Sequence, residues 1–117
     1  MRVYIAGPYG DTNPEEVIAA NVRRADRVAR AFMRLGDSVY VPHKMSWGWE
    51  KDTELKRYDF LHLDETFLRY WATAIYQIPG VSSGADYETT RARELGLRVL
   101  PIEYIPLATI DRWPDVC

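Results

Sequence analysis

Short apolar runs alternate along the chain with longer segments in which apolar and polar residues mix. The apolar runs cover residues 2–6, 38–41, 72–78 and 97–100, and a Gly or Pro follows each of them directly. Runs of this length that end at turn-forming residues are typical of buried strands. The pattern therefore predicts four strands, with helices in the longer segments between them.

The first predicted helix spans residues 14–35, with Asn13 as its cap and Gly36 directly after its end. Apolar residues at three- and four-residue spacing can supply its buried stripe: Val17, Ala20, Val28, Ala31, Phe32 and Leu35. Four arginines fall on another face: Arg23, Arg27, Arg30 and Arg34. This arginine face is either a solvated surface or a patch that contacts phosphate or a partner.

Two more helices are expected, one that begins at Thr53 and one over residues 84–95 that Gly96 closes. Beyond the fourth strand, repeated prolines leave room for a possible fifth strand at 102–105 and for irregular structure or a short helix at 107–112. Strands that alternate with helices predict right-handed crossovers and a parallel sheet. We expect an α/β fold, a flavodoxin- or Rossmann-like three-layer sandwich of four or five parallel strands in the order 2-1-3-4, with any fifth strand last.

Length and composition narrow the possible functions. The 117 residues suit one domain, 1–117, whose last part, 106–117, we expect to be an irregular tail. The net charge of -2 argues against a nucleic-acid polymer as partner, and no apolar stretch approaches the ~20 residues of a membrane span. A single cysteine, Cys117, permits no internal disulfide, so we expect a cytoplasmic protein without a signal peptide. With only two histidines, and without a GxGxxG or Walker A pattern, the sequence predicts neither a metal nor a cofactor.

The segment 79–96 carries the strongest chemical signal. An apolar strand enters a Pro/Gly/Ser turn, and the turn opens into a helix, so the loop lies at the carboxyl edge where open α/β sheets bind ligands. Glu88 is expected in the first turn of that helix, where the helix dipole would keep it ionised and available as a nucleophile. The alternative is that Glu88 is only a helix-start residue on the surface.

Two other strand ends point to the same cleft. Gly7 and Pro8 follow the first strand, and a glycine there lets backbone approach a ligand, although turns after strands are often glycine-rich for conformational reasons alone. His43 follows the second strand and is either structural or part of the site. Nearby, Trp47 and Trp49 can stack on a ligand or pack under their loop.

Several of these segments together resemble the nucleoside 2-deoxyribosyltransferase-like superfamily, which includes the deoxynucleoside 5'-monophosphate N-glycosidases. The resemblance covers roughly residues 2 to 100 and rests on the Val-Tyr-Ile-Ala-Gly-Pro opening, Pro42-His43, a helix-borne Asp64 and the Ser-Gly-Ala-Asp-Tyr-Glu loop that ends at Glu88. It implies that Glu88 attacks the anomeric carbon of a nucleoside and that Tyr4 positions this nucleophile. It further implies that Asp64, 24 residues earlier (88 minus 64), contacts the base and helps to protonate it. The residues implied in substrate binding are Gly7, Pro8, Tyr9, His43, Ser82, Ser83 and Gly84.

Breaking an N-glycosidic bond builds positive charge on the sugar and negative charge on the departing base, which a carboxylate and an acid can offset. For Asp64 to act as that acid near neutral pH, burial or the Glu88 charge must raise its pKa. The sequence also departs from the family pattern. The monophosphate-specific branch has Ser and Arg where this chain has Pro8 and Gly10, and the deoxyribosyltransferases have an acidic residue where it has Ser82. We therefore expect hydrolysis of a nucleoside or nucleotide, with base exchange and non-catalytic nucleotide binding as alternatives.

The resemblance also implies a homodimer or higher homo-oligomer. Its interface would use the arginine face or the helix that carries Asp59.

Overall fold

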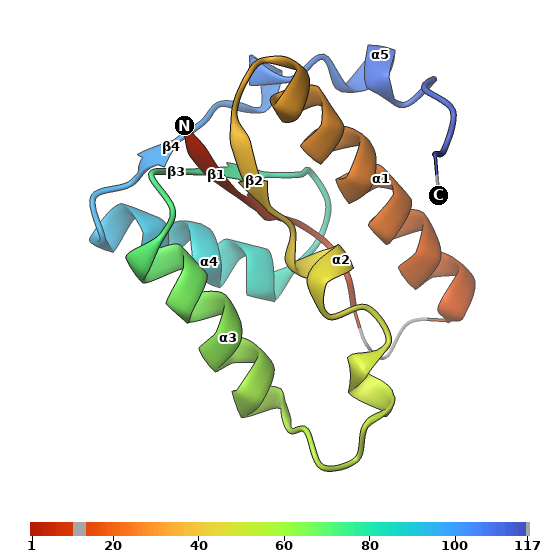
Figure 1. Cartoon of the computed structure of the whole chain (residues 1–117), viewed down its shortest axis with the longest axis vertical. Coiled ribbons are helices and arrows are strands. Elements are labelled where there is room, and N and C mark those ends of the chain that lie inside the picture. The colour runs from red at the N-terminus through yellow and green to blue at the C-terminus, as the bar shows by residue number, and fades with distance from the viewer. Residues whose placement is uncertain (11–13, 117) are drawn as a thin grey trace.

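The computed structural model describes residues 1–10 and 14–116, and its centre is a four-stranded sheet (Figure 1). The strands are β1 (Arg2–Ala6), β2 (Ser38–Tyr40), β3 (Ala74–Gln77) and β4 (Arg98–Val99). All neighbouring strands pair in parallel, in the order β2-β1-β3-β4. The predicted α/β class, sheet direction and strand order are confirmed.

Helices cover both faces of this sheet. They are α1 (Glu15–Arg34), α2 (Pro42–Met45), α3 (Arg57–Tyr70), α4 (Ser83–Glu94) and α5 (Leu107–Ile110), with 3-10 turns η1 (Trp49–Lys51) and η2 (Ile102–Tyr104). Figure 1 shows α1 and α5 on one side of the sheet and α3 and α4 on the other. The arrangement is the three-layer sandwich that the sequence predicts.

Side chains alternate across β1 and divide the interior into two cores. Val3 and Ile5 join the core under α1, in which Phe32 is fully buried. Tyr4 and Ala6 point to the opposite side, into the core under α3 and α4. The second core therefore carries a buried tyrosine toward the helices that hold the predicted catalytic residues.

The first helix differs from its prediction in start and in buried stripe. Helix α1 begins at Glu15, so Pro14 flanks it instead of occupying its first position, and the predicted cap Asn13 lies outside the described residues. Val28, Ala31 and Phe32 are buried as expected, but Val17, Ala20 and Leu35 are exposed. Instead, the buried stripe continues through Ile18, Val22 and Ala25. A small rotation of the helix satisfies the same spacing with a more apolar set.

Other boundaries also move. Helix α3 begins at Arg57 and not at Thr53, because Asp59 accepts a hydrogen bond from the Lys56 backbone N–H at 2.8 Å and caps the helix there. The predicted fifth strand is wrong, since residues 102–104 form the 3-10 turn η2. The Ile102 carbonyl accepts a hydrogen bond from the Tyr76 hydroxyl at 2.7 Å, so this segment folds against the edge of the core.

The C-terminal tail lies on the arginine face of α1. Asp115 pairs with Arg23 at 3.6 Å and with Arg27 at 2.9 Å. The Arg34 guanidinium lies over the Trp113 ring, 3.9 Å from its centroid, in a cation–π contact. Of the two alternatives for 107–112, the short helix is observed as α5, so the expectation of an irregular tail over 106–117 is wrong at residues 107–110. The tail occupies much of the arginine face that an interface would need.

Candidate active site

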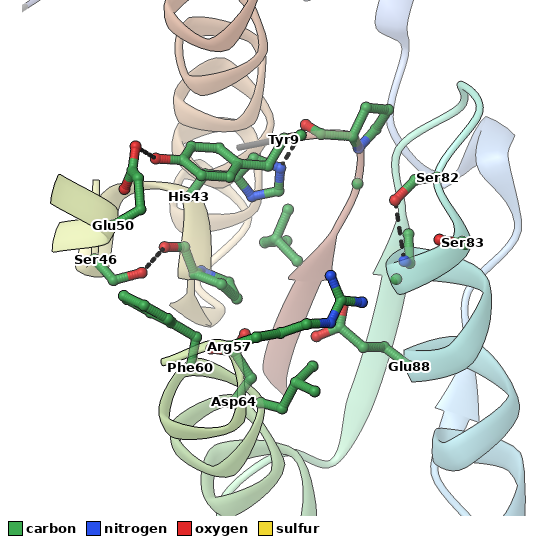
Figure 2. A pocket seen from close by; sticks show the side chains of 18 of the residues that line it. Tyr9, His43, Ser46, Glu50, Arg57, Phe60, Asp64, Ser82, Ser83 and Glu88 are labelled. Atoms are coloured by element: carbon green, nitrogen blue, oxygen red, sulfur yellow. Dashed lines mark hydrogen bonds between the residues drawn. The ribbon is translucent and has the colours of Figure 1, made fainter. Parts of the chain in front are cut away.

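The carboxyl edge of the sheet opens into a cavity of about 580 Å³ (Figure 2). Loops after β1 and β3, the short helix α2, and one face each of α3 and α4 contribute to its wall. Its lining includes all the residues implied in substrate binding, which are Gly7, Pro8, Tyr9, His43, Ser82, Ser83 and Gly84, together with Asp64 and Glu88. The structure thus brings together segments that are far apart in the chain.

Two glycines let the loops after β1 and β3 meet. A Cβ on Gly7 would lie 3.0 Å from the Cβ of Ile78. Gly80 has a φ of +137°, and a Cβ there would lie 2.6 Å from Cγ of Pro8. Gly7 lines the cavity as expected. The close contact that requires a glycine at this position, however, is with Ile78 directly after β3.

Glu88 lies in the second turn of α4, so its predicted first-turn position is wrong. Ser82 caps the helix instead, because its hydroxyl accepts a hydrogen bond from the Ala85 N–H at 3.1 Å. The Glu88 side chain accepts a hydrogen bond from the Tyr4 hydroxyl, as the resemblance implies. Burial raises the pKa of Glu88 to about 8, although the Tyr4 bond lowers it and the Asp64 charge raises it further. The prediction that the helix dipole keeps Glu88 ionised is therefore wrong, since desolvation is the larger effect.

Asp64 projects from α3 into the same cavity (Figure 2). Its Oδ1 accepts a hydrogen bond from the Tyr40 hydroxyl at 3.1 Å. Burial raises the pKa of Asp64 to about 6, and the Tyr40 bond opposes this shift. A general acid near neutral pH needs a raised pKa, and burial supplies it for Asp64.

Each carboxylate among the described lining residues accepts a hydrogen bond from a tyrosine. Besides the Tyr4–Glu88 and Tyr40–Asp64 bonds, the Tyr9 hydroxyl donates to Oε1 of Glu50 at 2.9 Å. Burial and the neighbouring carboxylates raise the pKa of both Tyr4 and Tyr40. These two phenols therefore remain protonated donors throughout the neutral range.

His43 lies in α2 and is 5% exposed. Its Nε2–H donates to the Pro8 carbonyl at 2.9 Å, and its ring meets Tyr9 edge-on at 6.0 Å between centroids. Burial lowers the pKa of His43, so the imidazole is neutral at pH 7. His43 thus lines the cavity and also holds the loop after β1.

Among the lining residues on α3, the sequence analysis predicts Asp64 as a site residue but not Arg57, Phe60 or Leu61. Arg57, Phe60, Leu61 and Asp64 lie at helical spacing on the face that meets the cavity. The same spacing is present in the sequence, but the predicted helix begins at Thr53, before the observed start at Arg57. Among the residues that the structure describes, none forms an ion pair or hydrogen bond with the Arg57 side chain.

Trp47 and Trp49 do not contribute to this wall. They are 50% and 45% exposed, and neither lines the cavity. Stacking on a ligand inside this cavity is therefore not supported for either ring.

Within residues 1–10 and 14–116, no three His, Cys, Asp or Glu side chains are grouped so that they could hold a metal ion. No helix in the same residues has the length and apolar character of a membrane span.

Comparison with known proteins identifies the fold. No protein-family model matches the sequence, and no curated protein matches it. Among solved structures, the 2-deoxyribosyltransferase of the psychrotolerant bacterium Bacillus psychrosaccharolyticus superposes with a TM-score of 0.63 and 19% sequence identity. The match covers 85% of this chain and 69% of that one. The chain therefore has a nucleoside deoxyribosyltransferase-like fold, as its sequence resemblance indicates.

Proposed function

We propose that this chain cleaves the N-glycosidic bond of a nucleoside or nucleoside 5'-monophosphate, with Glu88 as the nucleophile. The observation that carries the proposal is the pair of Glu88 and Asp64, which project from different helices into one cavity and are each held by a buried tyrosine. Its volume of about 580 Å³ lies within the usual range of small-molecule sites.

In the first step, a carboxylate oxygen of Glu88 attacks C1' while the bond from C1' to the base breaks. The bonding electrons leave with the base, and Asp64 transfers its proton to the base. Tyr4 donates to Oε2 of Glu88, which leaves Oε1 for the sugar. The products are a glycosyl ester on Glu88, a neutral free base and an ionised Asp64.

In the second step, water attacks C1' and gives its proton to Asp64. The ester bond breaks, and its electrons return to the Glu88 carboxylate. Two displacements at C1' retain its configuration. The enzyme is restored with its charge on Glu88 and its proton on Asp64.

The resting protonation state differs from this reactive one. The pKa of Glu88 is about 8 and that of Asp64 about 6, so between these values the pair holds one proton, mostly on Glu88. The reactive form, with its proton on Asp64 and its charge on Glu88, is therefore the minor one of the two singly protonated forms. The pKa order alone would favour Asp64 as the nucleophile, so the assignment of Glu88 rests on its sequence motif and the Tyr4 bond.

The second candidate function is base exchange, in which a free base replaces water in the second step. The solved neighbour that favours it is a 2-deoxyribosyltransferase. Against it stands Ser82, which occupies the place of the transferases' acidic residue and is engaged as the cap of α4. We therefore place hydrolysis first.

The substrate's anionic group, if it has one, has a candidate partner in Arg57. This guanidinium lines the cavity without a protein partner among the described residues. It offers a cation that the loop after β1, with Pro8 and Gly10, does not supply. A nucleoside 5'-monophosphate would place a phosphate where a nucleoside has only a hydroxyl, so comparing the two substrates measures this contribution.

The decisive experiment measures free base by chromatography from a panel of ribo- and deoxyribonucleosides and their 5'-monophosphates, with and without a second base. Glu88→Gln should abolish base release, whereas Glu94→Gln, near the exposed end of the same helix, should retain it. Mass spectrometry of the enzyme after a rapid quench should find the glycosyl adduct on Glu88.

An undiminished rate in Glu88→Gln, or an adduct on Asp64, would overturn the assignment. Faster turnover of substrate with an acceptor base than with water alone would favour the transferase. Calorimetric binding without turnover by any panel member would favour a nucleotide-binding module over both enzymes.

We also propose a homodimer. Since the tail covers much of the arginine face, the remaining predicted interface is α3, whose Tyr58 and Tyr70 are 73% and 74% exposed. Sedimentation that finds only monomer at micromolar concentration would contradict this prediction.

A further inference from the structure

A second tyrosine–carboxyl pair lies beside the first one. Tyr4 and Tyr40 are direct partners in the register of β1 and β2, and their ring centroids are 5.5 Å apart. Tyr4 donates to Glu88 of α4, whereas Tyr40 donates to Asp64 of α3. Two neighbouring strands therefore each hold one carboxyl of the candidate site.

The helix that carries Asp64 also holds the Tyr40 ring. Phe67 lies one turn after Asp64 on α3 and stacks on Tyr40 with a centroid distance of 3.9 Å and an angle of 7°. Tyr40 is itself 6% exposed and belongs to the core under α3 and α4. With the ring packed and the hydroxyl bonded, neither Tyr40 nor the Asp64 carboxyl is free to rotate without losing a contact.

We infer that Tyr40 is a positioning residue that directs the acidic proton of Asp64 onto Oδ2, the oxygen that then faces the departing base. This inference rests on the proposed function, in which Asp64 is the general acid. Tyr40 is not itself the proton source. Asp64 is the proton source, because it gives its proton to the departing base and takes another from water in the second step.

The chemistry follows from the number of donors and acceptors. The Tyr40 hydroxyl has one proton, and its bond of 3.1 Å places that proton on Oδ1 of Asp64. A neutral carboxyl whose Oδ1 accepts this bond carries its own proton on Oδ2. When Asp64 has lost that proton, the same Tyr40 bond stabilises the carboxylate that remains.

Strand register then sets the geometry of the reaction. Because Tyr4 and Tyr40 are paired directly across β1 and β2, the separation of the nucleophile and the acid depends on the rigid spacing of two parallel strands. Residues on helices alone would shift with each helix. Anchoring both carboxyls to one sheet holds them in a fixed relation while the substrate reacts.

The test replaces Tyr40 with Phe, which removes only the hydroxyl and keeps the ring stacked on Phe67. The matched control is Tyr76→Phe, because Tyr76 is also a buried sheet tyrosine but donates to the Ile102 carbonyl at 2.7 Å, in the opposite core. We expect Tyr40→Phe to lower kcat by about ten- to a hundredfold with little change in KM. Tyr76→Phe should lower the melting temperature and leave kcat within about twofold.

The pH profile separates a positioning role from a structural one. The Tyr40 hydrogen bond lowers the pKa of Asp64, so Tyr40→Phe should raise this pKa. The pH at which the rising limb of the kcat profile levels off should therefore be higher in the variant. In an Asp64→Asn background, Tyr40→Phe should change kcat by less than about twofold, because no acidic proton is left to direct.

Titration of the ¹³C-labelled Asp64 carboxyl by NMR gives a readout that needs no turnover. The Asp64 pKa should be higher in Tyr40→Phe than in the parent protein and unchanged in Tyr76→Phe. If Tyr40→Phe folds poorly, Phe67→Leu should shift the same pKa in the same direction, because it loosens the Tyr40 ring.

An unchanged Asp64 pKa in Tyr40→Phe would overturn the inference, as would a parental kcat and pH profile in an active enzyme. Absence of base release from the parent protein would instead refute the proposed function. The two failures are therefore distinguishable.

Discussion

Replacing Asp64 with Asn gives the sharpest test of how the two carboxyls divide the chemistry. Asn keeps the size of the side chain and can still accept a hydrogen bond from Tyr40, but it cannot donate an acidic proton. The change also removes a negative charge that raises the pKa of Glu88. It therefore alters both steps of the proposed protonation scheme in known directions.

The shape of the parent pH profile follows from the two pKa values. Activity requires an ionised Glu88, whose fraction rises with pH through about 8, and a protonated Asp64, whose fraction falls with pH through about 6. The product of these fractions rises up to about pH 6, stays level to about pH 8 and then falls. In Asp64→Asn only the Glu88 fraction remains, so the falling limb should disappear.

The rate at a single pH is a poorer readout. Loss of a general acid costs about 10²- to 10⁴-fold. The variant no longer needs the minor form with the proton on Asp64, and this gain offsets part of the loss at neutral pH. The Glu88 pKa should fall below about 8 but stay above its ordinary value of 4.5, because burial remains the largest cause of its shift.

The assay measures initial rates of base release from pH 4.5 to 10 for the parent protein, Asp64→Asn and Glu65→Gln. Glu65 is a matched control because it follows Asp64 on α3 but pairs with Arg91 at 2.8 Å. The control should keep the parental profile. A falling limb above pH 8 in Asp64→Asn like that of the parent would refute the reasoning. Inactivity at every pH would indicate that Asp64 is the nucleophile and Glu88 the general acid.

Two further predictions concern stability and cavity shape. The Glu88→Gln variant should be more stable relative to the parent protein at pH 9 than at pH 4. The pKa of Glu88 is raised from 4.5 to about 8 in the folded state, so the parent loses stability as pH rises through this range, by roughly 4–5 kcal/mol at most. Thermal unfolding of both proteins checks this, and a difference that does not grow with pH would contradict it. Gly80→Ala should lower the melting temperature more than Gly96→Ala and should also reduce activity, because only at Gly80 would the new Cβ meet a neighbour, Cγ of Pro8 at 2.6 Å. Equal melting temperatures for the two variants would show that Pro8 yields without strain.

Much of the architecture can be predicted from the sequence alone. Four apolar runs ended by Gly or Pro predicted the strands, and the alternation with helices predicted their order and direction. These features are local or follow from the handedness of the crossover, so they need no knowledge of distant contacts. The meeting of the first strand's loop with the segment before Glu88 followed from the same topology.

Details that depend on competing contacts were predicted less well. The spacing on α1 allowed two neighbouring stripes, and packing selected the one through Ile18 and Val22. The run at 102–105 was apolar enough for a strand, but it packs against the Phe32 side of the core as a 3-10 turn. The environment of the arginine face could not be predicted either, because it depends on the tail folding back through Asp115 and Trp113.

The candidate site shows the same division more clearly. The segment around Glu88 could be predicted from residue types and spacing, and the roles of Asp64 and Tyr4 were implied by the family resemblance. The pairing of Tyr40 with Asp64, the contribution of Arg57 and the raised pKa of Glu88 were not visible. Hydrogen bonds and desolvation depend on which distant side chains exclude water from a carboxyl, and only the packed sheet and helices determine that.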